Sequence, residues 1–223
     1  HRATAEHMAL EPPALVQGFL DMAPDMGELG KYITSCFGPF DFKSVDQKVP
    51  DTLFDEDTTI RVGDKEVHLL HVGPAHTAGD TLVHVPADRT VYTGDILFIG
   101  GHPIVWEGPV HNWIDACEKI QAMDVETIVP GHGPITTKAG VEEVRQYLLT
   151  IRNEARLRYE AGMSYQEAAM DIALGVFDDW GDRERIVVNC ATLFREFGAE
   201  HTPEVAELFA GMAAYAAARP QTR

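Results

Sequence analysis

A run of β-structure over residues 58–93, in which glycine-containing turns separate short strands, constrains the fold of this chain most strongly. The stretch TTIRVGDKEVHLLHV predicts two short strands joined at Gly63-Asp64. A glycine-first pair of this kind suits the tight turn of a hairpin. The stretch DTLVHVPADRTVYTGD continues the pattern, with a turn near residues 87–89. We therefore expect a sheet built from consecutive short strands.

A helix and one further strand follow this run. Apolar residues recur at helical spacing from about Asn112 to Met123. The apolar stretch TIVP then predicts a buried strand that ends at His132. This order of elements predicts an α/β protein in which the polar candidate residues lie just past the ends of strands.

From Ala139 onward the signals for strands stop, and four helices are predicted. The first is one long amphipathic helix, and the last is rich in alanine. An apolar stripe from Val141 to Ala155 indicates the first helix, and a capping box of Ser164 and Glu167 starts the second. The third is predicted over residues 183–197 and ends at Gly198, and the fourth starts at Thr202-Pro203.

The segment from Glu11 to Pro50 gives a weaker pattern. It predicts a helix around Pro13 to Met22 and then an irregular loop that can cover a site. Prolines, glycines and aromatic residues interrupt any longer periodicity there. The sequence shows no internal repeat and no low-complexity tract.

The charge balance argues against two classes of partner. The chain has 35 acidic and 18 basic side chains, a net charge of −17, which repels nucleic-acid phosphates and anionic lipid surfaces. The longest small-apolar stretch, LFAGMAAYAAA, is too short to cross a bilayer, and no secretory signal opens the sequence. Cys36, Cys117 and Cys190 are widely spaced and predict reduced thiols in a cytoplasmic protein. We therefore expect neither nucleic acid nor a membrane as partner.

Three short motifs carry the candidate chemistry, each at a junction between a strand and a loop. They are AHTAGD around His76, YTGD around Asp95 and VPGHGP around His132. Two imidazoles and a carboxylate are ligands that zinc, iron(II) and manganese share. Taken singly, each motif has a simpler interpretation, because a lone histidine is more often a packed or surface residue and Gly-Asp pairs are common in turns.

Together and in this order, the motifs resemble those of the metallo-β-lactamase superfamily of metal-dependent hydrolases. The match runs from about Thr58 to Pro134, with H-T-x-G-D, T-G-D and P-G-H-G in the family's sequence. The resemblance implies an αββα sandwich, of which this chain is the C-terminal portion with an added helical C-terminal extension. It also implies two divalent metals, zinc by default with iron or manganese as alternatives, in which His76 binds the first, His132 the second and Asp95 bridges them.

An aspartate at the bridging position resembles the glyoxalase, lactonase and cyclase branches of the superfamily. The stretches GDILFIGGHPIVWEGPVHNWIDACEKI and RIVVNCATLFREFG are similar to the branch that contains second-ring cyclases of aromatic polyketides. The resemblance therefore implies a hydrolase that acts on an ester, lactone, thioester or polyketide-like carbonyl compound. A polyketide cyclase/dehydratase, or a metal-free degenerate fold that acts as a binding or scaffold protein, are the alternatives.

The chain departs from the family in one respect, because the signature H-x-H-x-D-H, which supplies the other ligands and the catalytic aspartate, is not among these residues. His68 and His71 do not replace it, since H-L-L-H spacing puts them on opposite faces of a strand. We expect the motif upstream, in an N-terminal αβ half, because the sequence starts at His1 without a methionine. Residues 1–138 are then a partial metallo-β-lactamase-like domain, and residues 139–223 a helical extension that packs on it.

Three ligands shared by two metals leave each ion with one histidine and half of a carboxylate. We therefore expect this form to hold metal weakly and to be inactive alone. A single ion held by His76, Asp95 and His132 together stays open, since three protein ligands plus water is a known arrangement.

Further residues complete the predicted site. Thr77, Asp80 and Thr93 can hydrogen-bond the ligands, or can simply form the turns. The substrate pocket is predicted from residues after Asp95, which combine aromatic area with polar groups. These residues are His102, Ile104, Trp106 and His111, although Ile104 and Trp106 can instead pack beneath the helices. Finally, an apolar stripe on the last helix predicts a homodimer through the C-terminal helices, formed by Leu208, Phe209, Met212 and Tyr215.

Overall fold

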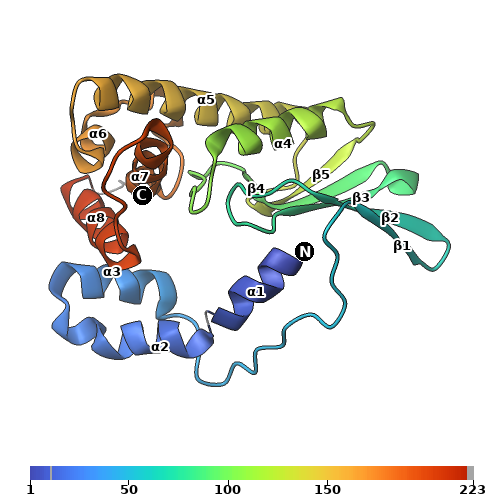
Figure 1. Ribbon diagram of the computed structural model, residues 1–223, viewed down its shortest axis with the longest axis horizontal. Helices are drawn as coiled ribbons and strands as arrows, with labels where there is room; N and C mark the ends of the chain where they lie inside the picture. The colour runs from blue at the N-terminus through green and yellow to red at the C-terminus, as the bar shows by residue number, and fades with distance from the viewer. Residues whose placement is uncertain (11, 220–223) are drawn as a thin grey trace.

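The computed structural model describes residues 1–10 and 12–219 and is built on a five-stranded sheet in the order β1-β2-β3-β4-β5 (Figure 1). Neighbouring strands are antiparallel from β1 to β4, and β5 is parallel to β4. The predicted hairpin is confirmed, since Val62 pairs with Lys65 across a Gly63 with φ of 63°. The strands are β1 Thr58–Val62, β2 Lys65–His71, β3 Thr81–Val85, β4 Thr90–Phe98 and β5 Thr127–His132. Because β2, β4 and β5 run in one direction, their C-terminal ends lie at the same edge of the sheet.

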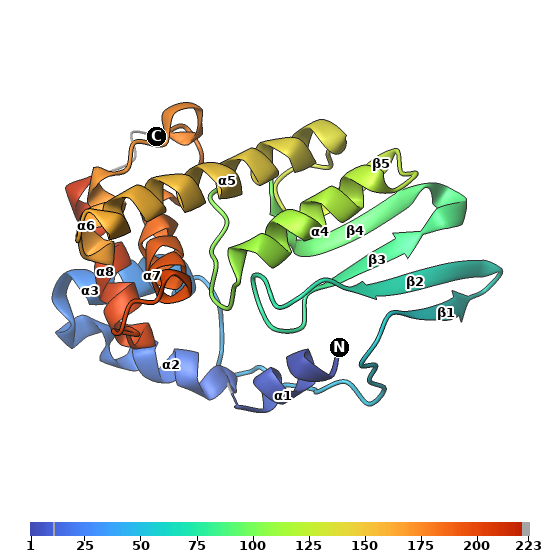
Figure 2. The same cartoon turned by 45° about the horizontal axis from the view of Figure 1, so that its top comes forward.

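Two helices, α4 (Val110–Ala122) and α5 (Lys138–Glu160), cover one face of the sheet (Figure 2). The predicted helix after the sheet is thereby confirmed, with its start two residues earlier. Apolar side chains at helical spacing explain the packing, because they bury one stripe of each helix against the sheet. The fully buried residues of this layer include Leu82, Val91, Ile128, Trp113, Cys117, Ile120, Val144 and Leu148. The registers place Ile60 and Tyr92 on the opposite face, where they are 45% and 47% exposed.

The remaining C-terminal helices pack beside the sheet layer. They are α6 (Tyr165–Asp171), α7 (Ile186–Phe197) and α8 (Val205–Ala218). The capping box of Ser164 and Glu167 is confirmed, as is the stop at Gly198, which adopts φ of 101°. The predicted start at Thr202-Pro203 is wrong, because the first helical bond of α8 runs from the N–H of Leu208 to the carbonyl of Glu204. Helix α5 begins at residue 138 and packs on α4, before that point, and on α7, after it. The division of the chain at residue 138 therefore stays a prediction.

The apolar stripe of α8 is used inside the chain, which corrects the reason for expecting a homodimer. Leu208, Met212 and Tyr215 are 9%, 2% and 1% exposed, in contact with the rest of the core. Phe209 packs against Phe37 and Trp106, with ring centroids 6.0 and 5.9 Å apart. With these side chains already covered, the stripe leaves little apolar area for a second copy.

Three N-terminal helices lie below the others in Figure 1: α1 (Arg2–Leu10), α2 (Pro13–Met22) and α3 (Gly27–Phe37). The prediction of α2 is confirmed, whereas the irregular loop expected after it is wrong over α3. Two glycines conceal that helix in the sequence, and one of them, Gly30, is needed because a Cβ there would lie 1.8 Å from the Ala23 carbonyl oxygen. Helix α3 packs on α8.

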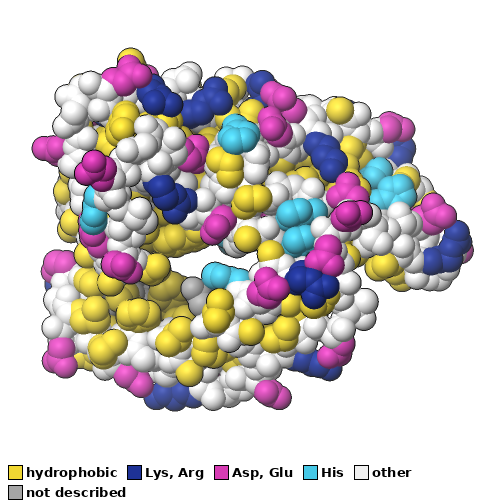
Figure 3. Space-filling model, in the orientation of Figure 1, with side chains coloured by type: hydrophobic (Ala, Val, Ile, Leu, Met, Phe, Trp, Pro, Cys, Tyr) yellow, Lys and Arg dark blue, Asp and Glu magenta, His cyan; other side chains and the backbone are white. Residues whose placement is uncertain are grey.

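Helix α2 leaves apolar side chains at the surface. Leu15, Phe19 and Met22 are 51%, 39% and 53% exposed, and hydrophobic atoms gather in this lower part of the molecule in Figure 3. Over residues 1–10 and 12–219, none of the helices has the length and apolar character that a membrane crossing requires.

Candidate metal centre

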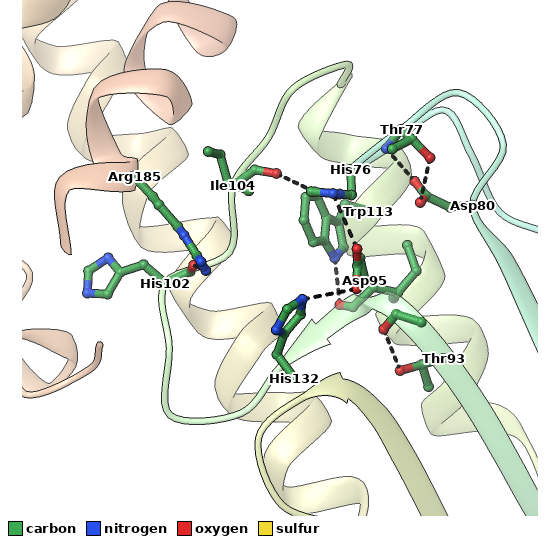
Figure 4. A network of polar contacts seen from close by, with 12 residues as sticks. His76, Thr77, Asp80, Thr93, Asp95, His102, Ile104, Trp113, His132 and Arg185 are labelled. Carbon is green, nitrogen blue, oxygen red and sulfur yellow. Dashed lines mark hydrogen bonds and ion pairs between the residues drawn. The ribbon is translucent and has the colours of Figure 1, made fainter. Parts of the chain in front are cut away.

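Three side chains singled out by the sequence meet at the edge where β2, β4 and β5 end (Figure 4). His76 lies in the loop after β2, Asp95 in β4 and His132 at the end of β5. Nε2 of His76 is 3.4 Å from Oδ2 of Asp95, and Nε2 of His132 is 3.3 Å from Oδ1 of the same carboxylate. The two imidazoles therefore face different oxygens of one carboxylate.

His76 is oriented by a backbone carbonyl. Its Nδ1 lies 2.7 Å from the carbonyl oxygen of Ile104, which can only accept a hydrogen bond, so Nδ1 carries the proton. The other ring nitrogen, Nε2, faces Oδ2 of Asp95, and in the neutral ring it is the nitrogen that offers a lone pair to a metal. The ring packs edge to face on Trp113, and the side chain is only 12% exposed. Trp113 itself is fixed by a 2.8 Å hydrogen bond from its indole N–H to the Ile96 carbonyl.

Two features position His132 and Asp95. The His132 ring stacks on Phe98 with centroids 4.3 Å apart and an interplanar angle of 9°. Gly131 leaves the space that Asp95 occupies, because a Cβ on Gly131 would lie 2.4 Å from Oδ1 of Asp95 and 2.7 Å from the Gly94 carbonyl. Asp95 and His132 are more open than His76, at 40% and 53% exposure of the side chain.

The three groups do not form a closed site around one point. Within the described part of the chain, no three His, Cys, Asp or Glu side chains are arranged so that they could hold a metal ion. Each of the two oxygens of Asp95 faces one histidine. This arrangement provides two partial donor sets that share a carboxylate.

The side chains expected to support the ligands, Thr77, Asp80 and Thr93, form hydrogen bonds within the neighbouring turns and strands. The backbone N–H and the hydroxyl of Thr77 each donate to the carboxylate of Asp80, both at 2.9 Å. Burial raises the pKa of Asp80, while those two hydrogen bonds oppose the shift. Thr93 donates to the carbonyls of Gly94 and Val129. These contacts agree with the turn-forming alternative.

The predicted pocket residues do not line one surface. His102 is wrong as a pocket residue, because it is fully buried and both ring nitrogens are engaged, Nδ1 with the Tyr147 hydroxyl and Nε2 with the Phe177 carbonyl, each at 3.0 Å. Ile104 is 8% exposed, and Trp106 packs on Phe209, as the alternative interpretation expects. His111 is exposed on the first turn of α4.

Sequence reasoning missed a polar stripe on α7 that holds the loop after β4. Asn189 and Thr192 bond the backbone of Val105, and the carboxylate of Glu196 accepts the N–H of Val110 at the start of α4. These three residues follow one another at helical spacing of three and four, within a helix that is otherwise apolar on that face. That interruption of the apolar pattern is the signal that could have identified them.

The chain is thus an α/β protein in which helices cover one face of the sheet. Its candidate centre, two imidazoles and a carboxylate, lies at one edge of that sheet. The sequence model of the metallo-beta-lactamase superfamily matches residues 8–132, more than half of the 223 residues. The chain belongs to the metallo-beta-lactamase superfamily, whose members generally bind divalent metals.

Curated relatives match parts of the chain. It is 28% identical over 107 residues to "Beta-lactamase-like protein 2 homolog" of Caenorhabditis elegans, which covers 48% of this chain and 35% of the relative. It is 31% identical over 104 residues to hydroxyacylglutathione hydrolase of Brucella anthropi, covering 44% and 37%. The chain thus spans little more than a third of the length of these relatives.

Solved structures show the same fold. A metallo-beta-lactamase family protein from Thermus thermophilus matches with a TM-score of 0.50 and 16% identity, over 66% of this chain and 49% of that one. The sec-alkylsulfatase Pisa1 from Pseudomonas sp. matches with a TM-score of 0.51 and 12% identity, over 70% and 28%. At these identities the likeness concerns the fold alone.

Proposed function

We propose that this chain carries part of the centre of a metal-dependent hydrolase, in which His76, Asp95 and His132 are metal ligands. The observation that supports this most directly is the placement of one imidazole nitrogen at each oxygen of Asp95, at 3.4 and 3.3 Å. A purely structural role would not require both histidines to direct Nε2 at one half-exposed carboxylate. The membership of the chain in the metallo-beta-lactamase superfamily supports the same assignment.

The chemistry of the donor set fits a divalent metal. Imidazole nitrogen and carboxylate oxygen suit zinc, and iron or manganese nearly as well. A divalent metal bound there supplies Lewis acidity toward water and toward a carbonyl oxygen. The residues of the chain contribute orientation: Ile104 holds the proton of His76 on Nδ1, and Phe98 holds the plane of His132.

The substrate class we propose is an ester, lactone, thioester or polyketide-like carbonyl compound. The likeness to the Brucella anthropi hydroxyacylglutathione hydrolase supports a hydrolase, and the activity of any longer protein that contains this chain belongs to the same proposal. A polyketide cyclase/dehydratase would use the same Lewis acidity. A metal-free binding or scaffold protein is the second candidate, favoured by the finding that no three donors in the described residues enclose a common point.

Zn²⁺ titration of the metal-free chain, followed by native mass spectrometry and calorimetry, tests the proposal. We expect wild-type protein to bind Zn²⁺, and Asp95→Asn to lose binding at both histidines because Asp95 faces both. His76→Ala should lose one part of the donor set and weaken binding less than Asp95→Asn. The matched control is His201→Ala, which removes an exposed histidine that contacts Glu207 and belongs to none of the three motifs.

Two results would contradict the proposal. Wild-type protein that takes up no Zn²⁺, Fe²⁺ or Mn²⁺ would favour the scaffold candidate for this chain. Equal Zn²⁺ binding by wild type and Asp95→Asn would mean that the metal is held elsewhere. Where binding is present, hydrolysis of an aryl ester, a lactone and a thioester by a longer protein that contains this chain then distinguishes the substrate classes.

A further inference from the structure

We propose that Asn189 of α7 is a positioning residue for His76, and that it acts by fixing the loop segment 103–105, whose central carbonyl sets the proton position of the His76 ring. The importance of His76 as a ligand rests on the function proposed above. The hydrogen-bond chain from Asn189 to His76 does not, because each of its links joins residues of this chain.

The first link joins Asn189 to the backbone on both sides of Ile104. Its Nδ2 donates to the Pro103 carbonyl at 2.9 Å, and its Oδ1 accepts the N–H of Val105 at 2.8 Å. Asn189 is fully buried, so water does not replace either bond when the side chain is changed. A second bond from α7, from the Thr192 hydroxyl to the Val105 carbonyl at 2.7 Å, holds the far end of the same segment. The orientation of the Ile104 peptide is therefore set from α7.

The second link joins that peptide to the candidate centre. The Ile104 carbonyl accepts the Nδ1–H of His76 at 2.7 Å, and Nε2 faces Asp95 (Figure 4). In the neutral ring, this hydrogen bond leaves Nε2 without a proton. A solvent-exposed neutral imidazole prefers the proton on Nε2, so the carbonyl selects the less common tautomer. A hydrogen bond to the distal ring nitrogen that fixes the tautomer and ring plane is a general requirement of histidine ligands.

The third link fixes the orientation of the Asn189 amide itself. The carbonyl of Phe177 can only accept, so Nε2 of His102 donates to it and Nδ1 of His102 must accept from the Tyr147 hydroxyl. That hydroxyl then has only its lone pairs for Asn189, whose Nδ2 donates to it at 3.0 Å. Every group in this buried chain of hydrogen bonds has one possible role. The amide oxygen of Asn189 is thereby directed at Val105.

The consequence is that a helix distant in sequence controls which nitrogen of the neutral His76 ring carries the proton. A residue that merely stabilised the helices would leave the His76 tautomer unchanged when it was replaced. This difference separates a positioning role from a structural one, and it can be measured in the metal-free chain.

The experiment records long-range ¹H–¹⁵N correlation spectra of the ¹⁵N-labelled, metal-free chain at one pH where histidines are neutral, with the His76 signals assigned from the spectrum of His76→Gln. Wild-type protein should show a proton on Nδ1 of His76. Asn189→Leu, similar in size but without hydrogen-bonding groups, should shift His76 toward the Nε2–H tautomer. Cys190→Ala is the matched control, because Cys190 is the next residue on α7, fully buried in the apolar core, and its loss destabilises the same helix.

Zn²⁺ affinity is the second readout, and we expect Asn189→Leu to weaken it by about 10-fold to 100-fold relative to Cys190→Ala. Thr192→Val keeps the side-chain shape and should shift the tautomer in the same direction by less, so it decides the question if Asn189→Leu does not fold. A folded variant that retains the Nδ1–H signature would overturn the inference. Wild-type protein with the Nδ1–H signature but no Zn²⁺ affinity would instead count against the proposed function and leave the positioning role standing.

Discussion

The sheet edge and helix α7 contribute to the candidate centre in different ways. At the sheet edge, side chains within short motifs carry the chemistry, and Gly131, next to His132 in the sequence, makes room for Asp95 of the neighbouring strand. On α7, the side chains bond backbone groups of a loop some eighty residues earlier, as Asn189 does with Val105. Short motifs therefore identify the donor groups, whereas the groups that orient a donor are distributed over the fold.

The two regions also differ in how deeply their side chains are buried. Asp95 and His132 are about half exposed, so a change there is absorbed partly by solvent. Asn189 and Thr192 are 0% and 5% exposed, and an unpaired polar group left at either position costs about 1–3 kcal/mol. Two of the three donors are thus open, whereas His76, at 12% exposure, and the supporting residues on α7 are enclosed, and the open and enclosed groups should respond differently to pH and to substitution.

The largest effect we expect is loss of stability in acid through His102, which is also enclosed. Burial, together with repulsion from Arg183 and Arg185, lowers the pKa of His102 from its ordinary value of 6.5 to about 4. Between these values the unfolded chain binds the proton more readily, so the free energy of unfolding falls as pH falls from 6.5 to 4. The total contribution is roughly 3 kcal/mol. Urea unfolding at a series of pH values measures it.

The comparison for this prediction is His102→Asn, which removes the titrating ring. Carboxylates and other histidines also contribute to acid unfolding. The quantity of interest is therefore the difference between the pH profiles of wild type and His102→Asn. The variant should be less stable than wild type at neutral pH and lose less stability on acidification. Parallel profiles for the two proteins would mean that His102 is protonated in the folded state without cost.

The elements that the sequence predicted well are those specified by local signals. The hairpin at Gly63-Asp64 and the capping box at Ser164 depend on residues next to one another, and both are confirmed. Helix α3 was missed because Gly30, an unfavourable helix residue, is required by close contact with Ala23, which is a tertiary constraint. His102 was misassigned for a similar reason, since a polar residue after a strand gives no indication that Tyr147 and Phe177 will enclose it.

The next effect concerns the sheet edge and should be about 1–3 kcal/mol. Gly131→Ala places a methyl group within 2.4 Å of Oδ1 of Asp95 and 2.7 Å of the Gly94 carbonyl, so both the carboxylate and the strand must move. We expect a lower free energy of unfolding and altered NMR signals of Asp95 and His132. Gly18→Ala is the control, because nothing lies within 4 Å of a Cβ there and alanine favours its helix. Equal stability of Gly131→Ala and wild type would show that the edge is less tightly packed than these distances indicate.

The smallest effect tests whether loss of stability alone disturbs the centre. The Ser164 side chain accepts the backbone N–H of Glu167 and caps α6, so Ser164→Ala should cost about 1 kcal/mol. Helix α6 packs on α5 and α7, yet its cap contacts neither the loop segment 103–105 nor His76. The urea midpoint should therefore fall while the His76 ring signals stay as in wild type. If those signals moved as they do in Asn189→Leu, the centre would respond to any weakening of the helices, and the distinction between α7 and its neighbours would fail.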